Sequence, residues 1–192
     1  MDLQTSYSVF CGERLIGAGK LREMLHASKA FLERDNQANL LIFEDQTGRQ
    51  VDFDFSGSLA EVLARAEPAA ERVGPGRPKL GVVSREVSLL PRHWEWLEEQ
   101  PHGISAALRR LVDEAKKKNP GEQRARLGRE AVSKFMTAMA GNFEHYEEAT
   151  RALFAKDNAR FAQLIQDWPK DVRGHVLRML VEFSKPDPAE RA

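Results

Sequence analysis

A short segment near the middle of the chain, Gly74-Pro75-Gly76-Arg77-Pro78-Lys79, most strongly constrains the fold. Its two prolines lack backbone N–H donors, and its two glycines raise the entropic cost of ordering the backbone. The segment therefore cannot continue a helix and makes a poor strand. It predicts a boundary between elements, and the apolar patterns on its two sides differ.

The chain before this boundary has the pattern of a small α+β domain over residues 1–71. Buried or alternating apolar runs predict four strands, at residues 7–10, 14–16, 40–43 and 50–55. Tight turns at Gly12-Glu13 and at residues 45–48 join these strands in pairs. Helical spacing predicts a helix over residues 20–34, and the capping-box pattern Ser58-Leu59-Ala60-Glu61 opens a second helix. The predicted order is ββαββα.

The end of the chain is helical by its pattern. Asn119-Pro120-Gly121 marks a second break, and four apolar stripes with helical spacing follow it. They predict a small helical bundle over residues 122–184, after which residues 185–192 form a mobile tail. Residues 72–121 remain as a separate central segment with a basic arm.

The central segment combines one strand pattern with two helix patterns. Residues 84–90 predict a strand, and Pro91 suits the first turn of a helix because its missing N–H would be unpaired there. Pro101-His102-Gly103 ends that helix, and Ser105 is placed to cap the next one. The predicted buried stripe of this second helix is Ala107 or Leu108, Leu111, Val112 and Ala115.

This order of strand, helix, turn and helix resembles the ribbon-helix-helix family of bacterial repressors and antitoxins. The resemblance rests on Leu90-Pro91, Trp94, Leu97, Gly103-Ile104-Ser105, Leu108 and Leu111-Val112. In that family two chains pair their strands into a ribbon that enters the major groove of DNA. The resemblance therefore implies a homodimer that binds double-stranded DNA, with the start of the second helix near the DNA backbone.

The sequence leaves two alternatives for which face of the predicted strand meets DNA. In that family the residue just before the first helix is buried, and polar strand residues face the bases. Strict alternation from Leu90 would bury Leu90, Ser88 and Glu86 and turn Arg85, Val87 and Leu89 toward DNA. Two of the side chains facing DNA would then be apolar, and two of the buried ones would be polar. A bulge at Leu89-Leu90 would instead bury Val87 and Leu89 and expose Glu86 and Ser88. The candidate DNA-binding residues are Arg77, Lys79, Arg85, Ser88, Gly103, Ile104 and Ser105.

The distribution of charge also favours nucleic acid as the partner of the centre of the chain. Residues 72–129 carry 13 Lys or Arg against 7 Asp or Glu, whereas residues 1–71 carry 7 against 12. Gly-Arg-Pro at residues 76–78 resembles the centre of an AT-hook, whose arginine enters a narrow minor groove. Lys116, Lys117 and Lys118 either add phosphate contacts or serve only as favourable charges at a helix C-terminus.

No arrangement of residues indicates catalysis. The five histidines are scattered, and no metalloprotease, P-loop or dinucleotide-binding pattern occurs. We therefore expect no enzyme activity, no cofactor and no metal. Glu44, Asp45, Asp52 and Asp54 are placed to bind a divalent cation, but an alternating strand more commonly presents such residues as a solvated face. Cys11 is the single cysteine, which excludes an intramolecular disulfide.

The remaining features suggest a cytoplasmic bacterial protein. No apolar stretch approaches the length of a membrane span, and the first residues lack an export signal. The whole chain resembles the bacterial domain of unknown function 2239 family, particularly across residues 76–115 and 135–169. Three hypotheses follow: a dimeric DNA-binding transcriptional regulator, a non-catalytic protein interaction or dimerisation module, and an enzyme.

Overall fold

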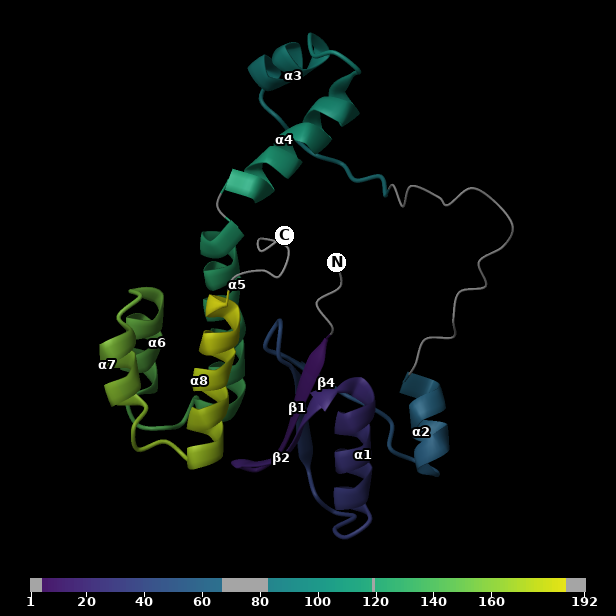
Figure 1. Ribbon diagram of the computed structural model, residues 1–192, viewed down its shortest axis with the longest axis vertical. Helices are drawn as coiled ribbons and strands as arrows, with labels where there is room; N and C mark the ends of the chain where they lie inside the picture. Colours follow the sequence, from purple (N-terminus) through teal and green to yellow (C-terminus); the bar gives the residue numbers. More distant parts are fainter. Residues whose placement is uncertain (1–4, 67–82, 119, 186–192) are drawn as a thin grey trace. The chain divides into compact units, whose positions relative to one another are not determined.

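The computed structural model describes residues 5–66, 83–118 and 120–185 (Figure 1). The chain divides into two compact units, one formed by Met1–Pro68 with Gly121–Ala192 and the other by Ala69–Pro120. The first and last segments, which the sequence analysis separated, thus share one unit. The fold is α+β, as predicted. Among the described helices, none has the length and apolar character needed to span a membrane.

The first unit contains a four-stranded antiparallel sheet. Its strands are β1 (Ser6–Cys11), β2 (Arg14–Lys20), β3 (Leu40–Glu44) and β4 (Arg49–Val51), in the spatial order β2-β1-β3-β4. The two predicted hairpins are confirmed, and a glycine with positive φ stands in each turn, at Gly12 and Gly48. Pairing of β1 with β3 joins the hairpins into one sheet.

Two helices cover one face of this sheet. They are α1 (Leu21–Leu32) and α2 (Leu59–Ala66), which agree with the predicted helices in this part of the chain. Val9 of β1 and Ile42 of β3 pack with Met24, Leu25 and Val62 in one apolar cluster. All five side chains are at most 2% exposed, so the centre of this face of the sheet is buried.

Four further helices lie on the other side of the sheet, and the first and the last of them face it (Figure 1). They are α5 (Pro120–Ala140), α6 (Tyr146–Phe154), α7 (Asn158–Leu164) and α8 (Lys170–Ser184). Phe10 and Phe43, which directly follow Val9 and Ile42, point to this side because successive strand residues face opposite ways. Their rings pack on Phe135 of α5, at centroid distances of 5.5 and 4.9 Å. The sheet therefore lies between two helical layers.

The turn between β3 and β4 fixes the distance between the sheet and α5. Gly48 has a φ of +65°, and a Cβ atom built there would lie 1.9 Å from the carbonyl oxygen of Ala131. Only glycine fits so close to a helix backbone in this left-handed conformation. The turn that the sequence predicted is thus also a tertiary contact.

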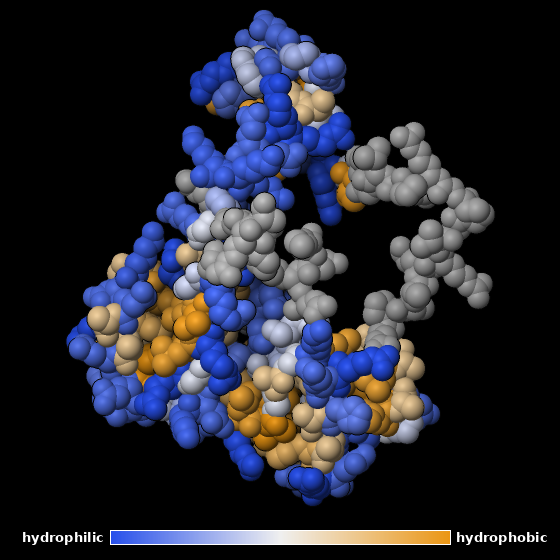
Figure 2. All heavy atoms as spheres, in the orientation of Figure 1, coloured by the Kyte–Doolittle hydropathy of each residue, from blue (hydrophilic) through white to orange (hydrophobic). Residues whose placement is uncertain are grey.

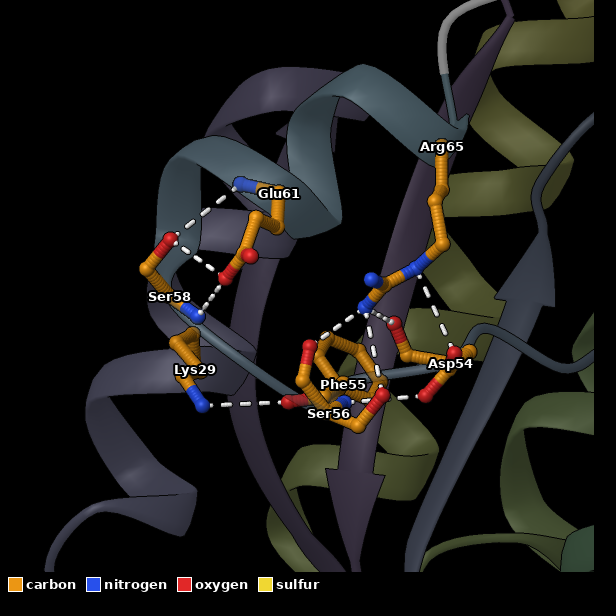
Figure 3. A network of polar contacts seen from close by, with 7 residues as sticks. All are labelled: Lys29, Asp54, Phe55, Ser56, Ser58, Glu61 and Arg65. Carbon is orange, nitrogen blue, oxygen red and sulfur yellow. Dashed lines mark hydrogen bonds and ion pairs between the residues drawn. The ribbon is translucent and has the colours of Figure 1, made fainter.

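Side chains from α1 and α2 hold the chain that follows β4 (Figure 3). Arg65 forms an ion pair with Asp54 at 3.3 Å and donates to the carbonyl oxygens of Asp54 and Ser56. Lys29 donates to the carbonyl oxygen of Phe55 at 3.0 Å. The predicted capping box is present, because Glu61 accepts from the Ser58 backbone N–H at 2.7 Å. The fourth strand was predicted over residues 50–55, but β4 ends at Val51. The residues that follow β4 make the hydrogen bonds to α1 and α2 instead.

Contact between α5 and α8 gives a test of this packing. A Cβ atom at Gly128 would lie 2.5 Å from Cβ and Cγ of Phe183. The α8 backbone fixes the position of Phe183 Cβ, so rotation of the side chain cannot relieve this contact. We expect Gly128→Ala to lower the free energy of unfolding by about 1–3 kcal/mol, measured by urea denaturation.

The matched control is Gly121→Ala in the same helix, where a Cβ atom would meet nothing within 4 Å. It should change the stability by less than about 1 kcal/mol, because only helix propensity is altered. Equal stability of the wild type and Gly128→Ala would contradict the close approach of α5 and α8.

Candidate nucleic-acid interface

The second unit contains two helices among its described residues, α3 (Pro91–Glu98) and α4 (Ile104–Lys118). As predicted, Pro91 occupies the first turn of α3, and Leu90 before it is extended, with φ −68° and ψ 149°. A proline ring is compatible with this position because no helical carbonyl accepts from it. The sequence therefore fixes the start of α3.

Residues 83–90, which precede α3, form neither helix nor strand. The strand predicted for residues 84–90 is thus wrong for the single chain. A strand needs a hydrogen-bonded neighbour, and the described part of the second unit contains no other extended segment to pair with it. Of its eight residues, seven are exposed and Leu89 is half-buried.

The turn between the helices has an unusual backbone. His102 and Gly103 both adopt positive φ, at 69° and 81°. The carbonyl oxygen of Gly103 accepts from the N–H of Ala107 at 3.1 Å, which places Gly103 at the cap of α4. Ser105 therefore lies inside the first turn and does not cap the helix, contrary to the prediction. The N–H groups of Ile104 and Ser105 point out of the helix start, where no helical carbonyl can accept from them.

The two helices bury little surface between them. Leu97 and Ala107 are each 3% exposed, and they are the buried residues of this unit within its described part. The stripe predicted to be buried on α4 is wrong beyond Ala107, because Leu111 is 38% exposed and Val112 is 56% exposed. We define the apolar surface of the second unit as Val87, Leu90, Trp96, Leu111 and Val112, which are all exposed by 38% or more.

The candidate DNA-binding residues divide into two groups. Arg77 and Lys79 lie outside the described residues. Arg85, Ser88, Gly103 and Ser105 are exposed and Ile104 is half-buried. The first turn of α4 carries no acidic residue, and its last turn carries Lys116, Lys117 and Lys118.

Three exposed arginines of this unit were missed in the sequence, Arg92 in the first turn of α3 and Arg109 and Arg110 on α4, of which Arg110 is paired with Glu114. Their helical positions carry no motif, and exposure became evident only once the packing of α3 and α4 was known. Figure 2 shows that the visible side of these helices is mainly hydrophilic.

Two of the four acidic residues considered for a cation site have other partners. Asp54 is paired with Arg65, and hydrogen bonds from Ser56, with a smaller contribution from Arg65, lower its pKa. Asp45 accepts a hydrogen bond from Ser6 at 2.8 Å. Within residues 5–66, 83–118 and 120–185, no three His, Cys, Asp or Glu side chains are grouped to hold a metal ion.

Comparison with protein families shows the family of the chain. A family described as an uncharacterized protein conserved in bacteria, DUF2239, matches residues 6–180. The chain belongs to this family. The DUF2239 match runs through both compact units, from β1 to α8, so the two units are parts of one protein type. No curated protein and no solved structure matches the chain. The resemblance to ribbon-helix-helix proteins stays a prediction.

Proposed function

We propose that this DUF2239 protein is a homodimeric DNA-binding protein, and that residues 83–118 of two chains form its DNA-binding part. In this arrangement two copies of residues 83–90 pair with each other. The pairing gives each segment the hydrogen-bonded neighbour that a single chain lacks. A bacterial transcriptional regulator is the class of protein that this arrangement fits.

The observation that carries the proposal is the exposure of the apolar surface of the second unit. Leu111 and Val112 have the spacing of a buried helical stripe, yet within one chain they face solvent. The described part of the unit buries only Leu97 and Ala107, which is too small a core for an independent domain. A second copy supplies the missing apolar contact, and a symmetric interface would bury the same residues on both chains.

The partial burial of Leu89 helps to choose between the two alternative strand faces. Leu89 is half-buried, whereas Ser88 and Leu90 on either side are exposed. Because side chains alternate along an extended chain, Val87 would share the inner face with Leu89. This favours the bulged arrangement, in which Glu86 and Ser88 face outward, and it leaves Arg85 on the inner face.

Three features support DNA as the ligand. The start of α4 offers free N–H groups and carries no acidic side chain, which suits a phosphate. Arg92 and Arg109, which belong to the same unit, are exposed to solvent. Arg77 and Lys79 add positive charge to the arm before residue 83, and phosphate contacts of this kind supply most of the affinity for DNA.

The alternative is a protein interaction module without DNA. The same apolar surface favours it, since Val87 at 55% exposure and Trp96 at 45% exposure would suit a protein partner equally well. The two readings differ in their dependence on salt. Binding to phosphates weakens steeply as salt rises, whereas burial of apolar surface does not.

Self-association tests the dimer. We expect Val112→Glu to shift the chain from dimer to monomer in sedimentation velocity at micromolar concentration, because a buried unpaired carboxylate is costly. The matched control is Val181→Glu on α8, where the valine is 59% exposed compared with 56% for Val112. The control should leave the dimer unchanged. A wild-type chain that sediments as a monomer would contradict the proposal.

DNA binding is tested by fluorescence anisotropy with random and A·T-rich duplexes across a salt series. We expect micromolar or tighter binding by the wild type at low salt. In Arg77→Ala/Lys79→Ala, the slope of log K against log salt should flatten by about 2, roughly 0.9 for each lost phosphate contact.

The control for charge alone is Arg34→Ala/Arg49→Ala, which removes two exposed arginines from the first unit. It should bind as the wild type does. If the wild type fails to bind either duplex at low salt while remaining a dimer, the protein interaction module is the better reading.

A further inference from the structure

A polar cluster lies in the core of the first unit, where α8 meets the sheet. His175 of α8 is 3% exposed and Ser8 of β1 is 1% exposed. Asp45, in the turn after β3, reaches the same place. Three of their atoms, Ser8 Oγ, Asp45 Oδ1 and His175 Nε2, are buried without a hydrogen-bond partner. Buried polar atoms are nearly always bonded, so this cluster calls for a physical explanation.

The imidazole of His175 has a different neighbour on each nitrogen. Nδ1 lies 3.4 Å from Nη2 of Arg178, and Nε2 lies 3.6 Å from Oδ1 of Asp45. A guanidinium can only donate, so Nδ1 must accept. The neutral ring then carries its proton on Nε2, directed at the Asp45 carboxylate. This geometry fits a neutral imidazole.

A second proton on the ring does not fit. It would sit on Nδ1 and face the positive charge of Arg178. Burial, and then the charge of Arg178, lower the pKa of His175 to about 4. Phe10 and Phe135 pack on the ring at centroid distances of 5.5 and 4.5 Å, and they supply no polar group to solvate a charge. Protonation therefore opposes the closed packing.

The other groups around the ring come from four elements. Arg178 lies on α8 and Asp45 in the turn after β3, and these are the charged groups that face the ring within the described residues. β1 contributes Ser8 and Phe10, and α5 contributes Phe135. Burial raises the pKa of Asp45, against the hydrogen bond from Ser6 and the charge of Arg178. Protonation of Asp45 therefore partly offsets the effect of His175 at the acid end.

We infer that His175, Asp45 and Arg178 form a proton-sensitive latch, which holds α8 against the sheet at neutral pH and releases it in acid. A second polar contact joins α8 to the sheet, since the N–H of Leu15 on β2 donates to Asp171 on α8 at 3.0 Å. Release of α8 would expose apolar residues such as Val172 and Val176, which are fully buried in the closed state. The latch does not depend on the proposed DNA binding.

The direction of the pH effect follows from proton linkage. An imidazole that is free in the opened state titrates near its usual value of 6.5, whereas in the closed state it titrates near 4. Between these values the opened state binds more protons, so acid favours opening. The stability of the closed state is complete above about pH 6.5 and falls as the pH drops toward 4.

Hydrogen exchange of the full chain tests the latch. Protection factors of the α8 amides, corrected for the intrinsic rate at each pH, should fall by up to about tenfold per pH unit below pH 6.5. The amides of α1, on the other side of the sheet, should keep theirs. In His175→Gln, which cannot take up the proton, the protection of α8 should be independent of pH over this range.

A second variant guards against misfolding of His175→Gln. Arg178 is exposed, and Arg178→Met removes the charge that opposes the protonated ring. Without this charge, the pKa of His175 in the closed state should lie above 4. As the pH is lowered, the protection of the α8 amides should therefore stop falling at a higher pH than in the wild type. Flat protection of α8 in the wild type between pH 7 and 5 would overturn the latch, as would equal losses in α1 and α8 or a His175→Gln profile equal to the wild type.

Discussion

The first unit depends on the burial of both faces of its four-stranded sheet. Neighbouring residues of β1 and β3 point to opposite sides, so Val9 and Ile42 enter one apolar cluster while Phe10 and Phe43 enter the other. The helices before residue 67 cover only the first side. The second side is covered by helices that follow residue 119, and without them Phe10 and Phe43 would face water. The two ends of the chain therefore stabilise each other.

The second unit is inserted into this shared fold and is much less complete. In the chain, the second unit follows α2 and precedes most of α5, so segments of the first unit stand on both sides of it. Among its described residues, Leu97 and Ala107 are buried, and an apolar core of this size does not balance the conformational entropy of an ordered domain. The apolar surface that it leaves exposed is the basis of the proposed association of two copies.

The polar cluster at His175 shows how the two ends of the first unit are joined. Apolar packing of α8 on the sheet is interrupted there by groups that fit together only in one protonation state. α8 also packs on α5 through Gly128 and Phe183, and α5 begins where the second unit ends.

The sequence by itself determined much of the local structure, although the cap of α4 lies at Gly103 and not at Ser105 as predicted. The capping box at Ser58 and Glu61, the turn at Gly48 and the start of α3 at Pro91 each follow from the chemistry of a few neighbouring residues. The tertiary structure decided which surfaces cover one another. Periodicity shows which side chains avoid water, but it does not identify the distant residues that cover them, as with Phe10 and the C-terminal helices. Leu111 and Val112 have the spacing of a buried stripe although the single chain leaves them exposed, because spacing along a helix does not show whether any surface covers that side.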